Sequence, residues 1–102
     1  MSRNRIELVG KVVSAPEVRT TPTGTPVIRI EVDCGDGREL LRLGIVMAGQ
    51  GAREIGARLG AGATVKVTGT LRGVRGRAWS SGAGGVEVLA SEIVEVVAGA
   101  SS

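Results

Sequence analysis

The chain has 102 residues, the size of one domain, with 13 cationic and 10 acidic side chains and a net charge of +3. It contains one cysteine and no histidine. These counts exclude an internal disulfide, the usual His/Cys metal sites and a Ser-His or Cys-His catalytic couple. We therefore expect a protein that is not an enzyme, needs no cofactor and works in a reducing cytoplasm, where disulfides are rare.

The cationic residues indicate the kind of partner. Only Lys11 and Lys66 are lysines, and the remaining cations are arginines, whose planar fork grips phosphate. This bias predicts an anionic partner such as nucleic acid, although a GC-rich genome would give the same composition. The N-terminal segment carries Glu7 and does not resemble a signal peptide. No apolar run approaches the roughly 20 residues of a membrane span, so we expect no membrane association.

The first half of the chain predicts β-structure. Four segments alternate between apolar and polar residues, which is typical of half-buried strands. They are residues 5–14, 17–20, 27–34 and 39–47, and we expect 17–20 to resume the first strand after a bulge or bend at Pro16. Prolines and glycines predict a turn over 21–26 and a tight hairpin over 35–37. Within 27–34, Ile28 and Ile30 are predicted to point inward and Arg29 outward.

The hydrophobic period then changes from 2 to 3.6, which predicts a short helix. Ala48, Ala52, Ile55 and Leu59 fall on one helical face. The glycines of 60–62 follow in the position of a C-cap.

Two more strands are predicted over 64–72 and 86–97, separated by a loop over 73–85. The alternation slips near Ser91, which predicts a β-bulge. The resulting order is that of an all-β, five-stranded OB-fold, a Greek-key barrel with one short helix between strands 3 and 4. We assign residues 1–97 to this domain and 98–102 to a short C-terminal end that we expect to be disordered.

Several segments resemble one protein family in the right order. They are Asn4-Arg-Ile-Glu-Leu-Val-Gly10, Ala15-Pro-Glu-Val-Arg19, Gly62-Ala-Thr-Val-Lys-Val-Thr-Gly-Thr-Leu-Arg72 and Val86-Glu-Val-Leu-Ala-Ser-Glu-Ile-Val-Glu-Val96. Together they resemble the bacterial single-stranded-DNA-binding proteins and their relatives of the primosomal replication protein N family, over residues 4–97. The resemblance implies a dimer or tetramer of OB-folds that holds single-stranded DNA during replication.

The chain departs from that family's pattern in three places. It stops at Ser102 without the acidic tail of the single-stranded-DNA-binding proteins, which favours the primosomal branch. Residues 40–42 read Leu-Leu-Arg where the family places an aromatic residue, and the loop over 73–85 is short and glycine-rich. We expect a homodimer that binds single-stranded DNA and works beside a replication helicase or other primosome proteins.

Six residues are candidates for nucleic-acid contact. They are Trp79, Arg77, Arg75, Arg72, Arg42 and Arg29. Trp79 is the one aromatic residue, and the family also carries a tryptophan in this loop, so we predict that it stacks on a base. Arg75 and Arg77 lie in the loop over 73–85, and Arg72 directly precedes it. No acidic residue within the loop offsets their positive charge. Arg29 and Arg42 are predicted on the outer face of strands 2 and 3, the usual binding face, and across from each other.

Other interpretations stay open. Trp79 would alternatively cover the barrel mouth or a dimer interface. Separately, the outward-facing apolar residues Val9 and Val13 indicate a subunit interface on the first strand. Arg29 and Arg42 would alternatively pair with the acidic residues at 31, 33 and 39. A protein-docking OB-fold with weak or no DNA binding is the alternative function, and RNA in place of DNA is another. Steep salt dependence distinguishes phosphate contacts from protein docking.

Overall fold

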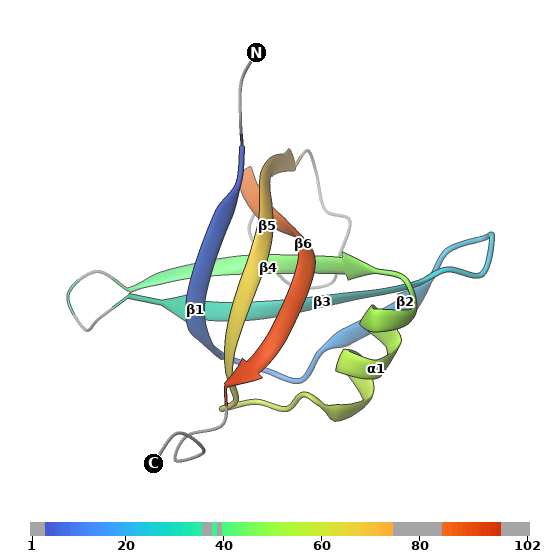
Figure 1. The fold of residues 1–102 in the computed structure, drawn as a ribbon, viewed down its shortest axis with the longest axis horizontal. Helices are drawn as coiled ribbons and strands as arrows, with labels where there is room; N and C mark the ends of the chain where they lie inside the picture. The colour runs from blue at the N-terminus through green and yellow to red at the C-terminus, as the bar shows by residue number, and fades with distance from the viewer. Residues whose placement is uncertain (1–3, 36–37, 39, 75–84, 97–102) are drawn as a thin grey trace.

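The computed structural model describes residues 4–35, 38, 40–74 and 85–96. Within these ranges the chain forms six β-segments and one helix (Figure 1). They are β1 (Ile6–Val12), β2 (Glu17–Thr20), β3 (Pro26–Cys34), β4 (Leu41–Ala48), α1 (Gln50–Arg58), β5 (Thr64–Val74) and β6 (Gly85–Val96). The predicted all-β class and the predicted order of elements are confirmed.

The strands form one closed sheet. Its order is β1-β5-β6-β4-β3-β2, and β1 also pairs with β3, which joins the two ends. The pairing of β4 with β6 is parallel, whereas the other described pairings are antiparallel. In Figure 1, β1, β5 and β6 cross the long ribbon of β3 and β4, so the barrel has two layers. This is the five-stranded barrel of an OB-fold.

β1 and β2 are two halves of the first barrel strand, as the sequence predicted. Both pair with β3, Val12 opposite Val32 and Glu17 opposite Arg29. Gly10 permits the close approach of β1 to β3, because a Cβ at this position would lie 2.6 Å from a carbonyl oxygen of the β3 backbone. Glycine at this position therefore allows the barrel to close.

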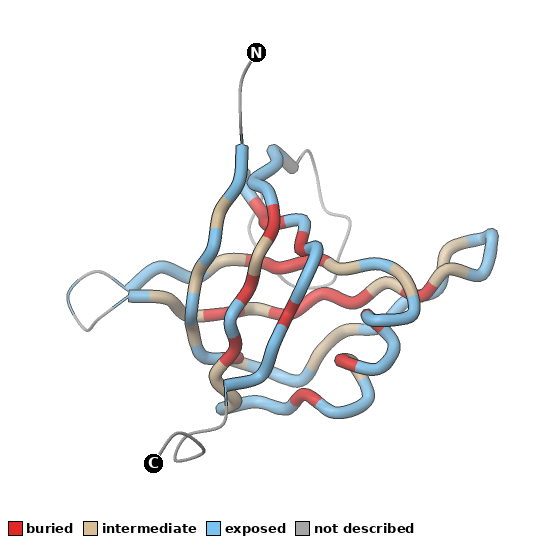
Figure 2. Tube along the Cα trace, viewed as in Figure 1, coloured by how far each residue is buried: buried red, intermediate tan, exposed pale blue. Residues whose placement is uncertain are grey.

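The core consists of aliphatic side chains on the inner faces of the strands. The largest fully buried side chains are Val12, Ile28, Ile30, Val32, Ile45, Val65, Val67 and Val88, none of which is more than 1% exposed. Figure 2 shows buried positions recurring along β3, β4 and β5. The predicted inward alternation over 27–34 is therefore confirmed, and β-branched residues fill the space that aromatic residues would otherwise occupy.

Helix α1 packs against β3 and β4 and buries Ala52, Ile55 and Leu59 at one end of the barrel. The sequence prediction was wrong about Ala48, which is exposed as the last residue of β4. The strand continues that far because Ala48 pairs with Val27 on β3.

The predicted glycine C-cap was also wrong. The helix stops at Leu59, which is extended (φ −80°, ψ 134°) because its side chain turns into the core. Gly62 instead takes a positive φ of 91° in the turn into β5, where its N–H donates to the Val12 carbonyl. The N-cap is a positive-φ glycine, Gly49, at 103°.

A β-bulge interrupts the pairing of β5 with β6. Thr68 lies opposite Glu92 whereas Gly69 lies opposite Ala90, which leaves Ser91 as the extra residue. The Ser91 hydroxyl donates to the Thr68 carbonyl oxygen at 3.2 Å. The bulge predicted near Ser91 is therefore confirmed, and it alters which β6 residues face the core.

Candidate nucleic-acid interface

The outer surface of β3, β4, β6 and β5 carries the three candidate arginines that the structure describes. Paired residues of neighbouring strands point to the same side, so the register defines rows across this surface. One row contains Asp33 and Arg42, the next contains Glu31, Gly44, Glu87 and Arg72, and a third contains Arg29, Val46, Leu89 and Thr70. Arg29 and Arg42 are thus two rows apart, and the prediction that they face each other was wrong.

Arg42 lies at one edge of this surface and is half exposed. Its Nε and Nη2 donate to the two carboxylate oxygens of Asp33, at 2.7 Å and 3.1 Å. This fork-shaped pair lowers the pKa of Asp33 and raises that of Arg42 through the hydrogen bonds first and the charges second. Arg42 is therefore accessible to a phosphate, but a carboxylate already occupies its fork.

Arg29 belongs to the outer face by register but is only 6% exposed. Its guanidinium lies over Gly44 on β4, where a Cβ would be 2.9 Å from Cζ and 3.1 Å from Nε. Nη1 is 3.9 Å from a carboxylate oxygen of Glu31. The bare backbone of Gly44 thus provides the space in which this arginine lies flat against the sheet. In this conformation Arg29 shapes the surface and offers little area for direct contact.

Arg72 and Glu87 form a further ion pair of the surface, across β5 and β6. The Arg72 Nε donates to a carboxylate oxygen of Glu87 at 2.8 Å. The Arg72 side chain is 46% exposed, whereas that of Glu87 is 6% exposed. The sequence analysis missed this partner of Arg72, because it considered acidic residues within the loop over 73–85 and Glu87 lies on the next strand.

These residues make a row of alternating charge across four strands. From β5 to β3 it runs Arg72, Glu87, the Arg29 guanidinium over Gly44, and Glu31. The sequence analysis named Glu31 as an alternative partner of the arginines but did not identify Glu87, although the alternation of Glu87 with buried Val88 was a usable signal. The row has the exposed Arg72 at one end, whereas Arg42, the other exposed arginine of this surface, lies in the neighbouring row beside Asp33.

Three candidate residues lie outside the described part of the chain. They are Arg75, Arg77 and Trp79, all in the segment between β5 and β6. Their predicted contact with nucleic acid stays a prediction.

Within the described ranges, no three His, Cys, Asp or Glu side chains are grouped so as to hold a metal ion. No helix in that part of the chain has the length and apolar character needed to cross a membrane.

The geometry of an OB barrel with arginines on its outer sheet agrees with the comparison with known families. A sequence profile described as "Single-strand binding protein family" matches residues 3–97. The chain belongs to the single-strand binding protein family. This membership makes it a single-stranded-DNA-binding protein and confirms that it is not an enzyme. It does not distinguish the primosomal branch from the rest of the family.

One solved structure illustrates how closely this single-strand binding protein shares the fold. The small single-stranded DNA-binding protein from Streptomyces coelicolor superposes with a TM-score of 0.81 at 22% identity. The match covers 96% of each chain. At this identity the likeness establishes the OB-fold alone. A search of the curated proteins gave no match.

Proposed function

We propose that this protein binds single-stranded DNA without sequence preference, as a homodimer, during DNA replication and in primosome assembly or replication restart. The observation that carries the proposal is the pair of half-exposed arginines, Arg42 and Arg72, on the outer sheet of a single-strand-binding barrel. Guanidinium groups bind phosphate through paired hydrogen bonds whatever the base sequence, so this surface supports binding without base readout.

Binding at these arginines is an exchange of anions. Asp33 and Glu87 occupy the guanidinium groups in the free protein, and a DNA phosphate takes the place of a carboxylate. Each phosphate so bound releases condensed counterions from the DNA. Trp79 adds stacking, which is worth roughly 1–3 kcal/mol per base, and Arg75 and Arg77 extend the basic track.

The homodimer is supported by apolar side chains on the outer face of β1 and β6. Val9, Val94 and Val96 are each about half exposed, at 54%, 45% and 45%. Val9 and Val94 lie on either side of Lys66 of β5 in one register row. A small domain gains stability when a second subunit covers such exposed apolar side chains.

The single tryptophan provides the test. The protein is titrated with oligo-dT at low salt and at about 200 mM salt, and both Trp79 emission and the anisotropy of a labelled oligonucleotide are followed. We expect quenching and a steep loss of affinity with salt. Binding without quenching would remove Trp79 from the contact, and no binding at low salt would refute the function. Sedimentation of the free protein tests the homodimer, and pull-down with a replicative helicase tests the primosomal setting.

A protein-docking role is the second candidate, and the charge compensation of the surface favours it. Arg42 and Arg72, the two exposed arginines of this surface, already have carboxylate partners, and this weakens their attraction for phosphate. Docking of a protein through apolar contacts would show shallow salt dependence. The titration above therefore distinguishes the two functions.

A further inference from the structure

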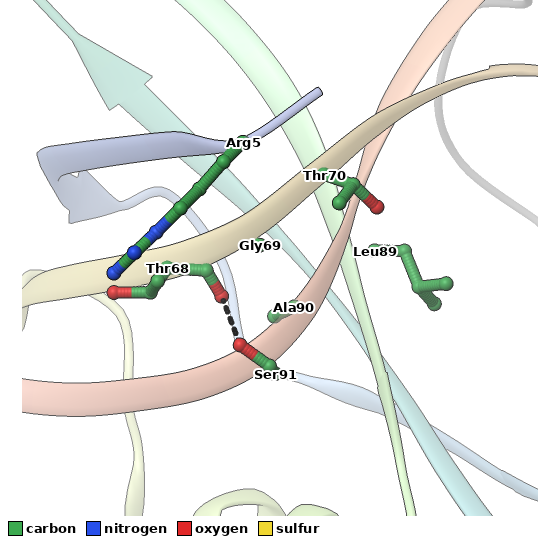
Figure 3. Close-up of a pocket in the computed structure, with 7 residues that line it drawn as sticks. All are labelled: Arg5, Thr68, Gly69, Thr70, Leu89, Ala90 and Ser91. Carbon is green, nitrogen blue, oxygen red and sulfur yellow. Dashed lines mark hydrogen bonds between the residues drawn. The ribbon is translucent and has the colours of Figure 1, made fainter. Parts of the chain in front are cut away.

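The β-bulge creates a hollow on the outer surface. The hollow begins at Thr70 and Leu89, which belong to the row that contains Arg29. It has a volume of about 460 Å³ and is lined by Arg5, Thr68, Gly69, Thr70, Leu89, Ala90 and Ser91. Figure 3 shows the Arg5 side chain extending from the residue just before β1 in the direction of Thr68, with Ser91 of β6 hydrogen-bonded to Thr68. Ligand pockets in proteins span roughly 300–1,000 Å³.

The walls combine the groups that a nucleotide needs. Thr68, Thr70 and Ser91 supply hydroxyls, and Leu89 supplies an apolar side chain that is 40% exposed. The lining contains one charged residue, Arg5, and no carboxylate. An apolar wall suits the face of a base, whereas hydroxyl and guanidinium groups suit a phosphate and sugar.

The backbone at Arg5 is positioned by the side chain of the preceding residue, Asn4. The Asn4 side chain accepts a hydrogen bond from the Leu71 N–H at 3.0 Å and donates one to the Leu71 carbonyl oxygen. This amide continues the pairing of β1 with β5 beyond Ile6, which lies opposite Gly69. The segment that carries Arg5 is thereby fixed beside Thr70.

Arg5 also differs from the arginines of the charged rows. Among the residues that the structure describes, no carboxylate forms an ion pair with Arg5, whereas Arg42 and Arg72 each have one. Two carboxylates, Glu7 and Glu92, lie opposite Thr68 by register, but neither lines the hollow. A phosphate at Arg5 would have no carboxylate to displace.

The hollow is continuous with the candidate interface. Leu89 lies next to Val46 in the row of Arg29, one row from Arg72 and Glu87. Neighbouring strands are about 4.8 Å apart, so a DNA strand crossing from β4 over β6 reaches the hollow within about 10 Å. A single arginine and an open wall hold a free nucleotide weakly, but a nucleotide tethered to contacts on β4 binds at high effective concentration.

We propose that this hollow binds one nucleotide of the bound single strand, with Arg5 on its phosphate and Leu89 against its base. The inference rests on the proposed function and deepens it by adding a contact beyond the OB-fold face of β3 and β4. Its ligand is a phosphodiester-linked nucleotide, and free mononucleotide or inorganic phosphate is not expected to bind measurably.

The test compares Arg5→Ala with Arg53→Ala, which removes the same charge from an exposed position on α1. With long oligo-dT, Arg5→Ala should weaken binding roughly threefold to tenfold and reduce the salt slope by about 0.7, the value for one phosphate on a single strand. Arg53→Ala should match the wild type. Leu89→Ala should weaken binding without changing the salt slope, because it removes an apolar contact and no charge.

The outcomes separate this inference from the function itself. If the wild type fails to bind oligo-dT, the proposed function fails and the inference with it. If the wild type binds but Arg5→Ala behaves as Arg53→Ala does, the inference alone is overturned. Sedimentation of Arg5→Ala is the second readout, and a change in oligomeric mass would assign the hollow to a subunit contact and overturn the pocket. Saturation by deoxythymidine monophosphate alone would overturn the requirement for a tethered strand.

Discussion

Replacing Asp33 with asparagine tests whether Arg42 contacts the DNA backbone. In the free protein the two oxygens of Asp33 accept hydrogen bonds from Arg42 at 2.7 Å and 3.1 Å. A phosphate must displace this carboxylate before it can use the guanidinium fork. Asparagine keeps the size of the side chain but removes its charge, so Asp33→Asn leaves Arg42 available and should tighten binding to single-stranded DNA.

The expected size of the effect follows from counterion release. On single strands each phosphate contact contributes about −0.7 to the slope of log affinity against log salt concentration. Asp33→Asn should therefore steepen the slope by up to about 0.7. Over a fourfold rise in salt, from about 50 to about 200 mM, the variant should lose up to about 2.6-fold more affinity than the wild type loses. Its advantage is largest at low salt.

The assay is the anisotropy of labelled oligo-dT at several salt concentrations. Glu54→Gln is the matched control, because it removes one negative charge from an exposed position on α1, away from the outer sheet. The control corrects for the general rise in net charge. If Asp33→Asn and Glu54→Gln show the same slope and affinity, Arg42 does not contact the backbone, and this part of the interface is refuted.

Three further predictions concern packing and reactivity. Gly10→Ala should lower the free energy of unfolding by about 3 kcal/mol, because its Cβ meets the β3 backbone. Gly44→Ala should lower it by about 1–2 kcal/mol, because only the end of the Arg29 side chain must move. Urea denaturation measures both values, and a larger loss for Gly44→Ala than for Gly10→Ala would contradict the packing. Ile55→Ala should cost about 2–4 kcal/mol in the same assay and leave the salt slope of DNA binding unchanged, so a shifted slope would place α1 at the interface. Burial raises the pKa of the Cys34 thiol above its ordinary 9.0, so maleimide should react slowly at pH 8 and faster as the pH rises past 9; a rate equal to that of the urea-unfolded chain would show that the thiol is not protected.

The sequence by itself determined the strands, their inner faces and the fold class. Alternation with a period of 2 is a local property, and it correctly separated Ile28 and Ile30 from outward positions because each strand has one face on the core. The slip at Ser91 was visible for the same reason, since a bulge displaces the alternation by one residue. The helix ends were not predicted correctly, because the burial of Leu59 and the pairing of Ala48 depend on distant strands.

The contacts within the candidate site could not be predicted from local sequence patterns, because they depend on the tertiary structure. The sequence identified the arginines, but their partners depend on strand register, which joins residues far apart in the chain. Register brought Glu87 to Arg72, separated Arg29 from Arg42 by two rows, and set Gly44 beneath the Arg29 guanidinium. It also brought Arg5, which directly precedes β1, together with Thr70 of β5 and Leu89 of β6 around one hollow. Residue types and periodicity thus determined that the protein is a basic OB barrel. Only the closure of the sheet decided which of its charges are paired, buried or available, because ion pairs and pockets form between strands and not along them.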